Sequence, residues 1–314
     1  MSLDFEKDVA DIEAKIEEFK AKNPEPTGSL VKDLNRLELE RVEKLKETYA
    51  NLTPWQTVQV ARHPERPLIR DFINGLFSEF IELHGDRLFG DDHGMIGGFA
   101  TLENHRIMVI GHQKGRDLDE KIKCNFGQAC PEGYRKALRL MKLAEKFHLP
   151  IVTFIDTPGA FPGRDAEERG QAEAIARNLL EMFALKTPVI ALVTGEGGSG
   201  GAIGIGVGDI VLMLSNAVYS VISPEGCASI LWRDGSKAGE AANALKITAK
   251  SLLQLKIIDE IIPEPLGGAH RNHAATMKAT RKTLLKHLNS LAKISPKKLT
   301  SRRFEKFAAM GRFK

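Results

Sequence analysis

The sequence predicts an α/β protein in which helices cover a mostly parallel sheet, with helical extensions at both ends of the chain. Between residues 96 and 262, short apolar, β-branched runs alternate with longer segments of helical periodicity. Such alternation is typical of a parallel sheet with helices on its faces. Apolar residues at helical spacing before residue 50, and again after residue 266, predict the two extensions.

The first region, residues 1–85, is expected to be helical. Apolar residues recur at intervals of three and four over 5–19 and over 30–45, and two prolines and a glycine lie in the segment 23–28 between them. The two apolar seams predict an antiparallel helical hairpin, which should dock on the body or on a partner because helices this short are marginal alone. Residues 55–84 also have a helical pattern, interrupted by prolines.

The central region, residues 86–265, is expected to hold the sheet, and residues 266–314 to form a basic helical region. The patterns predict a β-hairpin whose turn is Asn104-His105. They also predict helices and strands, the helices at Pro131–His148 and Ala166–Phe183 and the strands at Ile151–Asp156, Pro188–Thr194, Ile210–Leu214, Tyr219–Ile222 and Ile257–Ile262.

Composition indicates a water-soluble globular protein, since 42% of the 314 residues are hydrophobic and 27% are charged. No apolar run reaches the roughly 18 residues that a membrane span needs. Three cysteines that form no disulfide framework indicate a reducing cytoplasm. Two of them, Cys124 and Cys130, lack the spacing of a zinc motif, so no metal site is expected in this chain.

The formal net charge of +4 is too small to imply nucleic acid by itself, but the charge is uneven. Twelve lysines and arginines and one acid lie between Lys278 and Lys314. The simplest interpretation is a solvated helix face or a mobile tail. A contact with an acidic partner, nucleic acid included, stays open.

The most informative motif is the glycine run Gly195–Ala202, which follows an apolar strand. So many glycines let a ligand approach the backbone closely, and free N–H groups at a helix start favour an anion. The run matches the dinucleotide fingerprint, but several strands precede it and no acid follows at the expected strand end. The segment Asp156–Gly159 matches a GTPase motif, but the upstream phosphate loop is missing.

The same run contains the Gly-x-Ser-x-Gly pattern of a hydrolase nucleophile around Ser199. Asp209 or Glu225, with His270 or His273, could complete a triad in the expected chain order. The two glycines that follow Ser199 and the missing upstream oxyanion motif count against a hydrolase, which remains an alternative.

The loops Asp156–Gly163 and Gly195–Ala202 together resemble the crotonase-like superfamily, and within it the biotin-dependent carboxyltransferases. The closer similarity is to the alpha-subunit family of the bacterial acetyl-CoA carboxylase carboxyltransferase, and it covers essentially the whole chain. The resemblance implies a crotonase-like core of stacked ββα units. Further blocks that carry it are Ala61–Pro67, Gly111–Arg116, Asn125–Gly127, Pro131–Ala137, Ala166–Gln171, Ser223–Ala228 and Ile262–Asn272.

The resemblance implies that the chain helps to transfer a carboxyl group from carboxybiotin, held on a separate carrier protein, to acetyl-CoA. The product would be malonyl-CoA, in the first committed step of fatty acid synthesis. The implied partners are a zinc-containing beta subunit in an α2β2 assembly, the biotin carboxyl carrier protein and biotin carboxylase. A stand-alone crotonase-like acyl-CoA hydratase or hydrolase, and a non-catalytic scaffold subunit, are the alternatives.

The resemblance also implies the site residues. The backbone N–H groups of Gly200 and Gly201 would form an oxyanion hole for the ureido oxygen of biotin. Lys114 and Arg116 are candidates for contact with the carboxylate or a CoA phosphate, with a solvated surface pair as the alternative, and His112 is expected to be a structural histidine. The other residues expected at the substrate are Gly198, Ala202, Pro158, Gly159, Ala160, Phe161 and Gly163.

Overall fold

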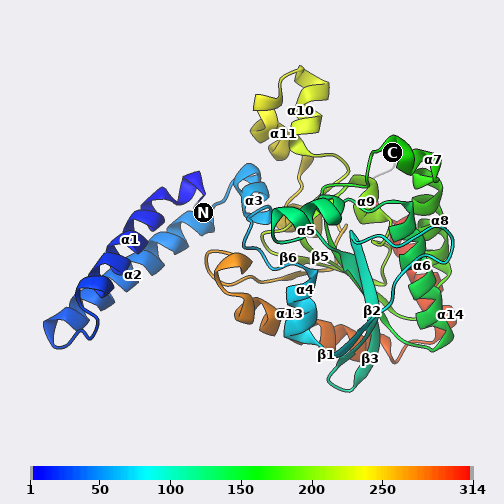
Figure 1. The fold of residues 1–314 in the computed structure, drawn as a ribbon, viewed down its shortest axis with the longest axis horizontal. Helices are drawn as coiled ribbons and strands as arrows, with labels where there is room; N and C mark the ends of the chain where they lie inside the picture. The colour runs from blue at the N-terminus through cyan, green and yellow to red at the C-terminus, as the bar shows by residue number, and fades with distance from the viewer. Residues whose placement is uncertain (1–2, 312–314) are drawn as a thin grey trace.

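The structure is a computed structural model that describes residues 3–311. Its centre is a sheet whose first three strands are antiparallel and whose remaining neighbours on the main path are parallel (Figure 1). This arrangement confirms the predicted α/β class. The strands on this path, in spatial order, are β1 (Ser78–Glu82), β2 (Met95–Leu102), β3 (His105–His112), β4 (Ile151–Thr157), β5 (Val189–Gly198), β6 (Ile210–Leu214) and β8 (Glu260–Ile262), and β7 (Val218–Ser220) pairs with the end of β5.

Helices cover both faces of the sheet. Gly97 and Ile110 are register partners on one face, and a Cβ on Gly97 would contact Leu140 of α6 (Pro131–Lys146). Phe154 faces the other way, toward Phe72 of α4 (Ile69–Leu76). Helices α8 (Gln171–Ala184) and α14 (Pro296–Ala308) lie on the α6 side, and α13 (His273–Leu291) lies beside α4 (Figure 1).

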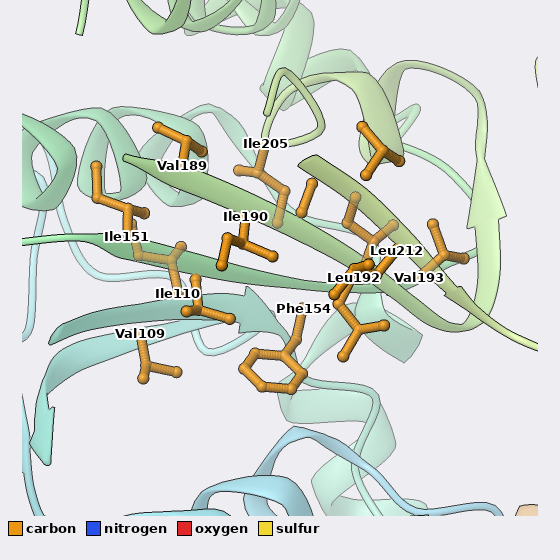
Figure 2. Close-up of a cluster of buried hydrophobic side chains, with 14 of the residues drawn as sticks. Val109, Ile110, Ile151, Phe154, Val189, Ile190, Leu192, Val193, Ile205 and Leu212 are labelled. Atoms are coloured by element: carbon orange, nitrogen blue, oxygen red, sulfur yellow. The ribbon is translucent and has the colours of Figure 1, made fainter. Parts of the chain in front are cut away.

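The central strands are buried on both faces. Every residue of β4 and β5 is buried, which explains why these strands read as continuous apolar runs instead of alternating ones. Figure 2 shows Ile110, Ile190 and Leu212 among the side chains that neighbouring strands contribute to this core.

The predicted antiparallel helical hairpin is confirmed. Helices α1 (Lys7–Lys22) and α2 (Ser29–Ala50) lie side by side and project from the body (Figure 1). Lys20 Nζ is 3.4 Å from Glu38, and Lys44 Nζ is 3.0 Å from Asp8, so the helices run in opposite directions. The base of the hairpin docks on the body, where Arg271 donates hydrogen bonds to carboxylates of η1 and α1.

The remaining elements are short helices and turns. Helices α10 and α11 project from the body on the same side as α3 (Figure 1). Within residues 3–311, no helix combines the length and the apolar character needed to cross a membrane. The remaining helices and turns are α3 (Pro54–Ala61), α5 (Leu118–Lys123), α7 (Arg164–Glu168), α9 (Ser199–Ile203), α10 (Pro224–Trp232), α11 (Ala238–Leu245), α12 (Ala249–Gln254), η1 (Asp4–Glu6), η2 (Asn125–Gly127), η3 (Gly235–Lys237) and η4 (Ala269–Arg271).

The prediction of a helical pattern over 55–84 was wrong at its end, because residues 78–82 form β1. This strand lies at the sheet edge and pairs with β2 across a register shift between Ser78 and Ile81. Its polar, irregular sequence gives no alternating pattern, so pairing with β2 decides its conformation. The turn of the next hairpin also lies one residue earlier than predicted, at Glu103-Asn104.

Three other predicted elements differ in extent. The helix predicted over Ala166–Phe183 is divided into α7 and α8 by Gly170, which has a left-handed φ of 82°. The strand predicted at Ile257–Ile262 is regular only from residue 260. The strand predicted at Pro188–Thr194 continues through the first glycines to Gly198, and α9, the helix that follows, has five residues.

The basic C-terminal region is only partly solvated. Arg303 is fully buried and its guanidinium is 2.7 Å from Asp209. Lys306 is also paired, 2.5 Å from Asp259. Two of the predicted surface cations therefore attach α14 to the sheet.

Candidate functional site

The two predicted loops meet at the carboxyl ends of β4 and β5. These strands are parallel neighbours, and their pairing ends with Thr157 opposite Gly197. A Cβ on Gly198 would overlap the carbonyl of Pro158, and a Cβ on Gly201 would lie 2.6 Å from the carbonyl carbon of Gly159. The two loops therefore lie against each other, and both positions need glycine because the two backbones touch.

The chain turns sharply between β5 and α9. Ser199, the first residue of α9, has a left-handed φ of 46°, and no side chain caps the helix. The backbone N–H groups of Gly200 and Gly201 lie in the first turn of α9, which begins at Ser199. The first N–H groups of a helix have no partner within it, so they are available to a ligand.

A pocket of about 420 Å³ opens beside Gly200. Its lining is mostly apolar, and the lining residues with side-chain hydroxyls are Ser199, Tyr219 and Ser220. An apolar cavity next to a few converging donors is typical of a small-molecule site. The lining residues are Ser199, Gly200, Ile203, Tyr219, Ser220, Val221, Leu245, Leu252 and Ile257.

The second loop is fixed by its own contacts. Thr157 Oγ1 donates to the Gly159 carbonyl and accepts from its N–H, at 2.7 and 3.1 Å. Gln171 Nε2 donates to the Phe161 carbonyl, and Gly163 precedes α7. Residues 158–160 pack directly against the glycine run, and no residue of 158–163 lines the pocket beside Gly200.

Lys114 and Arg116 take different positions. Lys114 Nζ is 2.5 Å from Asp156 Oδ1, and the same oxygen accepts the N–H of Glu196 at 2.9 Å. Arg116 forms a half-exposed ion pair with Asp71. The structure therefore brings Lys114 to the ends of β4 and β5, and holds Arg116 beside α4.

Sequence reasoning missed the role of Arg62, although the block that contains it was noted. Its guanidinium lies 2.5 Å from Glu196 and 2.5 Å from Glu225. Burial opposes the charge of Arg62, but hydrogen bonds to Glu196 and then Glu225 outweigh burial and raise its pKa. Glu196 lies within the glycine run, so a contact between distant segments fixes the strand that leads to Gly200.

The residues of the hydrolase alternative are engaged elsewhere. Asp209 pairs with Arg303, and Glu225 pairs with Arg62. His270 stacks on His63, and His273 lies 2.8 Å from the Glu65 carbonyl. Ser199 is consequently left without the base and acid that a triad requires.

The buried His112 is not suited to acid–base chemistry near pH 7. His112 is buried, and burial lowers its pKa to about 4, so it is neutral near pH 7. The part of the chain that the structure describes contains no group of three or more His, Cys, Asp or Glu residues placed to hold a metal ion.

Comparison with known proteins decides the family. Residues 2–311 match the family model described as acetyl co-enzyme A carboxylase carboxyltransferase-like. The chain belongs to this family. It is 56% identical over 312 residues to the acetyl-coenzyme A carboxylase carboxyl transferase subunit alpha of Geobacter metallireducens, covering 99% of this chain and 98% of that protein. It is 60% identical over 274 residues to the protein of the same name from Geobacter sulfurreducens, covering 87% and 86%.

Solved structures of acyl-CoA carboxyltransferases and a malonate decarboxylase share the fold of this family member. Transcarboxylase 12S matches with a TM-score of 0.59 at 20% identity, over 72% of this chain and 41% of that chain. A Pseudomonas malonate decarboxylase hetero-tetramer with coenzyme A matches with a TM-score of 0.58 at 15% identity, over 70% and 89%. The predicted crotonase-like fold is confirmed.

Proposed function

We propose that the chain is the alpha subunit of an acetyl-CoA carboxylase carboxyltransferase, which transfers the carboxyl group of carboxybiotin to acetyl-CoA. Its family membership and its relatives' names support this proposal. The observation that carries it is the pair of first-turn N–H groups of α9 at Gly200 and Gly201, beside a mostly apolar pocket at the carboxyl ends of β4 and β5.

The residues present fit the biotin head group. A bicyclic, mostly apolar ring with a polar ureido edge matches an apolar pocket of about 420 Å³ that has backbone donors at one side. Biotin, when bound, supplies the ureido group that carries the carboxyl. Gly200 and Gly201 would donate their N–H groups to the ureido oxygen, where negative charge increases as the carboxyl leaves. Donors held in place before the reaction stabilise such charge without reorganisation.

The neighbouring residues would shape this hole. Gly198 and Ala202 flank it in the chain, and contact with residues 158–163 holds both loops in place. The neutral, buried His112 is not suited to proton transfer near pH 7.

The partners belong to the same proposal. A beta subunit that holds zinc would bind acetyl-CoA and complete the site, in an α2β2 assembly. The biotin would arrive on a carrier protein after carboxylation by biotin carboxylase. We also propose a division of the chain into a hairpin region (1–85), a catalytic core (86–265) and a basic helical region (266–314).

The proposal is tested by measuring carboxyl transfer between malonyl-CoA and free biotin. The chain alone should be inactive, and mixing it with a carboxyltransferase beta subunit should give transfer. Full turnover by the purified chain alone would contradict the shared site. Enoyl-CoA hydration without biotin would favour the hydratase alternative, and inactivity of a stable complex would favour a scaffold.

A further inference from the structure

We propose that Arg62 is a positioning residue for carboxyl transfer. It holds the Glu196 carboxylate, and through it the end of β5 that leads to Gly200 and Gly201. The inference rests on the proposed function, because the two N–H groups matter only if a substrate oxygen meets them.

Arg62 donates two hydrogen bonds to the Glu196 carboxylate. Nε lies 3.1 Å from Oε2, and Nη2 lies 2.5 Å from Oε1. This parallel arrangement is specific to the planar guanidinium, and a lysine cannot reproduce it. Within residues 3–311, Arg62 is the partner found for the Glu196 carboxylate.

Residue 196 is also fixed through its backbone. Its N–H donates to Asp156 on β4, and it pairs with Val218 on β7. The carboxylate contact with Arg62 adds a third point of attachment, from α3. Four residues later the chain reaches Gly200, so the rotation of β5 at Glu196 affects where the N–H groups of α9 point.

The same guanidinium reaches the pocket wall through α10. Nη1 donates to Glu225 Oε1 at 2.5 Å, in the first turn of that helix. Helices α10 and α11 project from the body (Figure 1), and the pocket residues Val221 and Leu245 lie just before α10 and at the end of α11. Arg62 therefore links the donor strand to α10, the helix that follows Val221 in the chain.

The positive charge of Arg62 also affects the same site. Without the Arg62 guanidinium, the Glu196 carboxylate, 10% exposed, would lose its partner. An unpaired buried carboxylate is costly, and this one would oppose the negative charge that increases on the bound oxygen. Both effects act more on the transition state than on substrate binding, so kcat should fall more than KM rises.

The test uses the complex reconstituted with a beta subunit, and five variants of this chain, one of them Glu196→Gln alone. Arg62→Met should lower kcat about 10- to 100-fold, the size expected for a small displacement of reacting groups, with KM changed less than about threefold. The kcat of Arg62→Lys should lie between those of the wild type and Arg62→Met. Adding Glu196→Gln to Arg62→Met should recover about half of the loss on a logarithmic scale, since the unpaired charge is removed. Arg36→Met, an exposed arginine on α2, is the control and should match the wild type.

Unchanged kcat in an assembled Arg62→Met complex would overturn the inference. A double variant no better than Arg62→Met would also overturn it, because a purely structural role predicts no rescue by loss of the charge. If Arg62→Met fails to assemble, the kcat values of Arg62→Lys and Glu196→Gln test the inference. Wild-type kcat in both of these variants would overturn it. Inactivity of the wild-type complex would instead contradict the proposed function.

Discussion

Gly201 lies directly against Gly159. A Cβ on Gly201 would be 2.6 Å from the carbonyl carbon of Gly159 and 2.9 Å from the N of Ala160. Side chains do not approach a backbone this closely, so any residue larger than glycine must separate the two loops. Gly200 differs, because its Cβ would meet only Ile175 Cδ1, at an ordinary 3.4 Å.

The two neighbouring glycines should therefore respond differently to alanine. Gly201→Ala should lower the free energy of unfolding by about 1–3 kcal/mol, as overpacking does, and should reduce carboxyl transfer on the order of 100-fold. The free energy of unfolding of Gly200→Ala should lie within about 1 kcal/mol of the wild-type value, since alanine favours the helix. Denaturant unfolding of both variants checks the difference. Equal destabilisation would mean that the loops do not touch as described.

The Lys114–Asp156 pair should stabilise the fold, whereas the Arg116–Asp71 pair should not. Lys114 and Asp156 are 20% and 7% exposed, so Lys114→Met leaves a mostly buried carboxylate unpaired. We expect a loss of about 3 kcal/mol in the free energy of unfolding. Arg116→Met removes a half-exposed pair and should cost less than about 1 kcal/mol. A larger loss in Arg116→Met than in Lys114→Met would contradict this assignment.

The sequence predicted the centre of the fold because burial leaves a clear pattern there. Strands β4 and β5 are buried on both faces, and each reads as an apolar run ending in a loop. Parallel neighbours place their carboxyl ends together, so the meeting of the two loops followed from their order. The edge strand β1 has no such pattern, since exposed positions accept many residues.

The contacts that hold the site could not be predicted in the same way. Arg62 is 134 residues from Glu196 and 163 residues from Glu225. One sequence contains no signal that links charges so far apart. The family resemblance included the block Ala61–Pro67, but only the packing of α3 against the end of β5 gives Arg62 its partners.

Stability should fall on the acid side because of His112. Burial lowers the pKa of this histidine from 6.5 to about 4. The unfolded chain takes up a proton as pH falls below 6.5 and the folded chain does not, so stability present above pH 6.5 is lost toward pH 4. For His112 alone, the loss between pH 7 and pH 5 should be about 2 kcal/mol.

Denaturant unfolding of His112→Gln at both pH values checks this expectation. The loss between pH 7 and pH 5 should be about 2 kcal/mol smaller than in the wild type, whatever the stability of the variant at pH 7. Some pH dependence should remain, because burial also lowers the pKa of His270 to about 4. An unchanged pH dependence would show that His112 does not contribute.

Arg303 should hold the C-terminal helix to the sheet, whereas its neighbour Arg302 should not. The buried Arg303 guanidinium donates to Asp209 and to the carbonyls of Met182, Leu185 and Thr187, at 2.6–3.1 Å. Arg303→Met leaves these acceptors and the carboxylate unpaired, so the free energy of unfolding should fall by about 3–5 kcal/mol.

Arg302 is exposed, and Arg302→Met should change stability by less than about 0.5 kcal/mol. Both variants lose one positive charge from the same helix. A difference between them therefore measures the buried contacts and not the net charge of the basic region. Thermal or denaturant unfolding gives this comparison, and limited proteolysis should cleave α14 faster in Arg303→Met only. Equal behaviour of the two variants would mean that α14 is held by its apolar face, through Leu299 and Phe307, and that the buried guanidinium adds little.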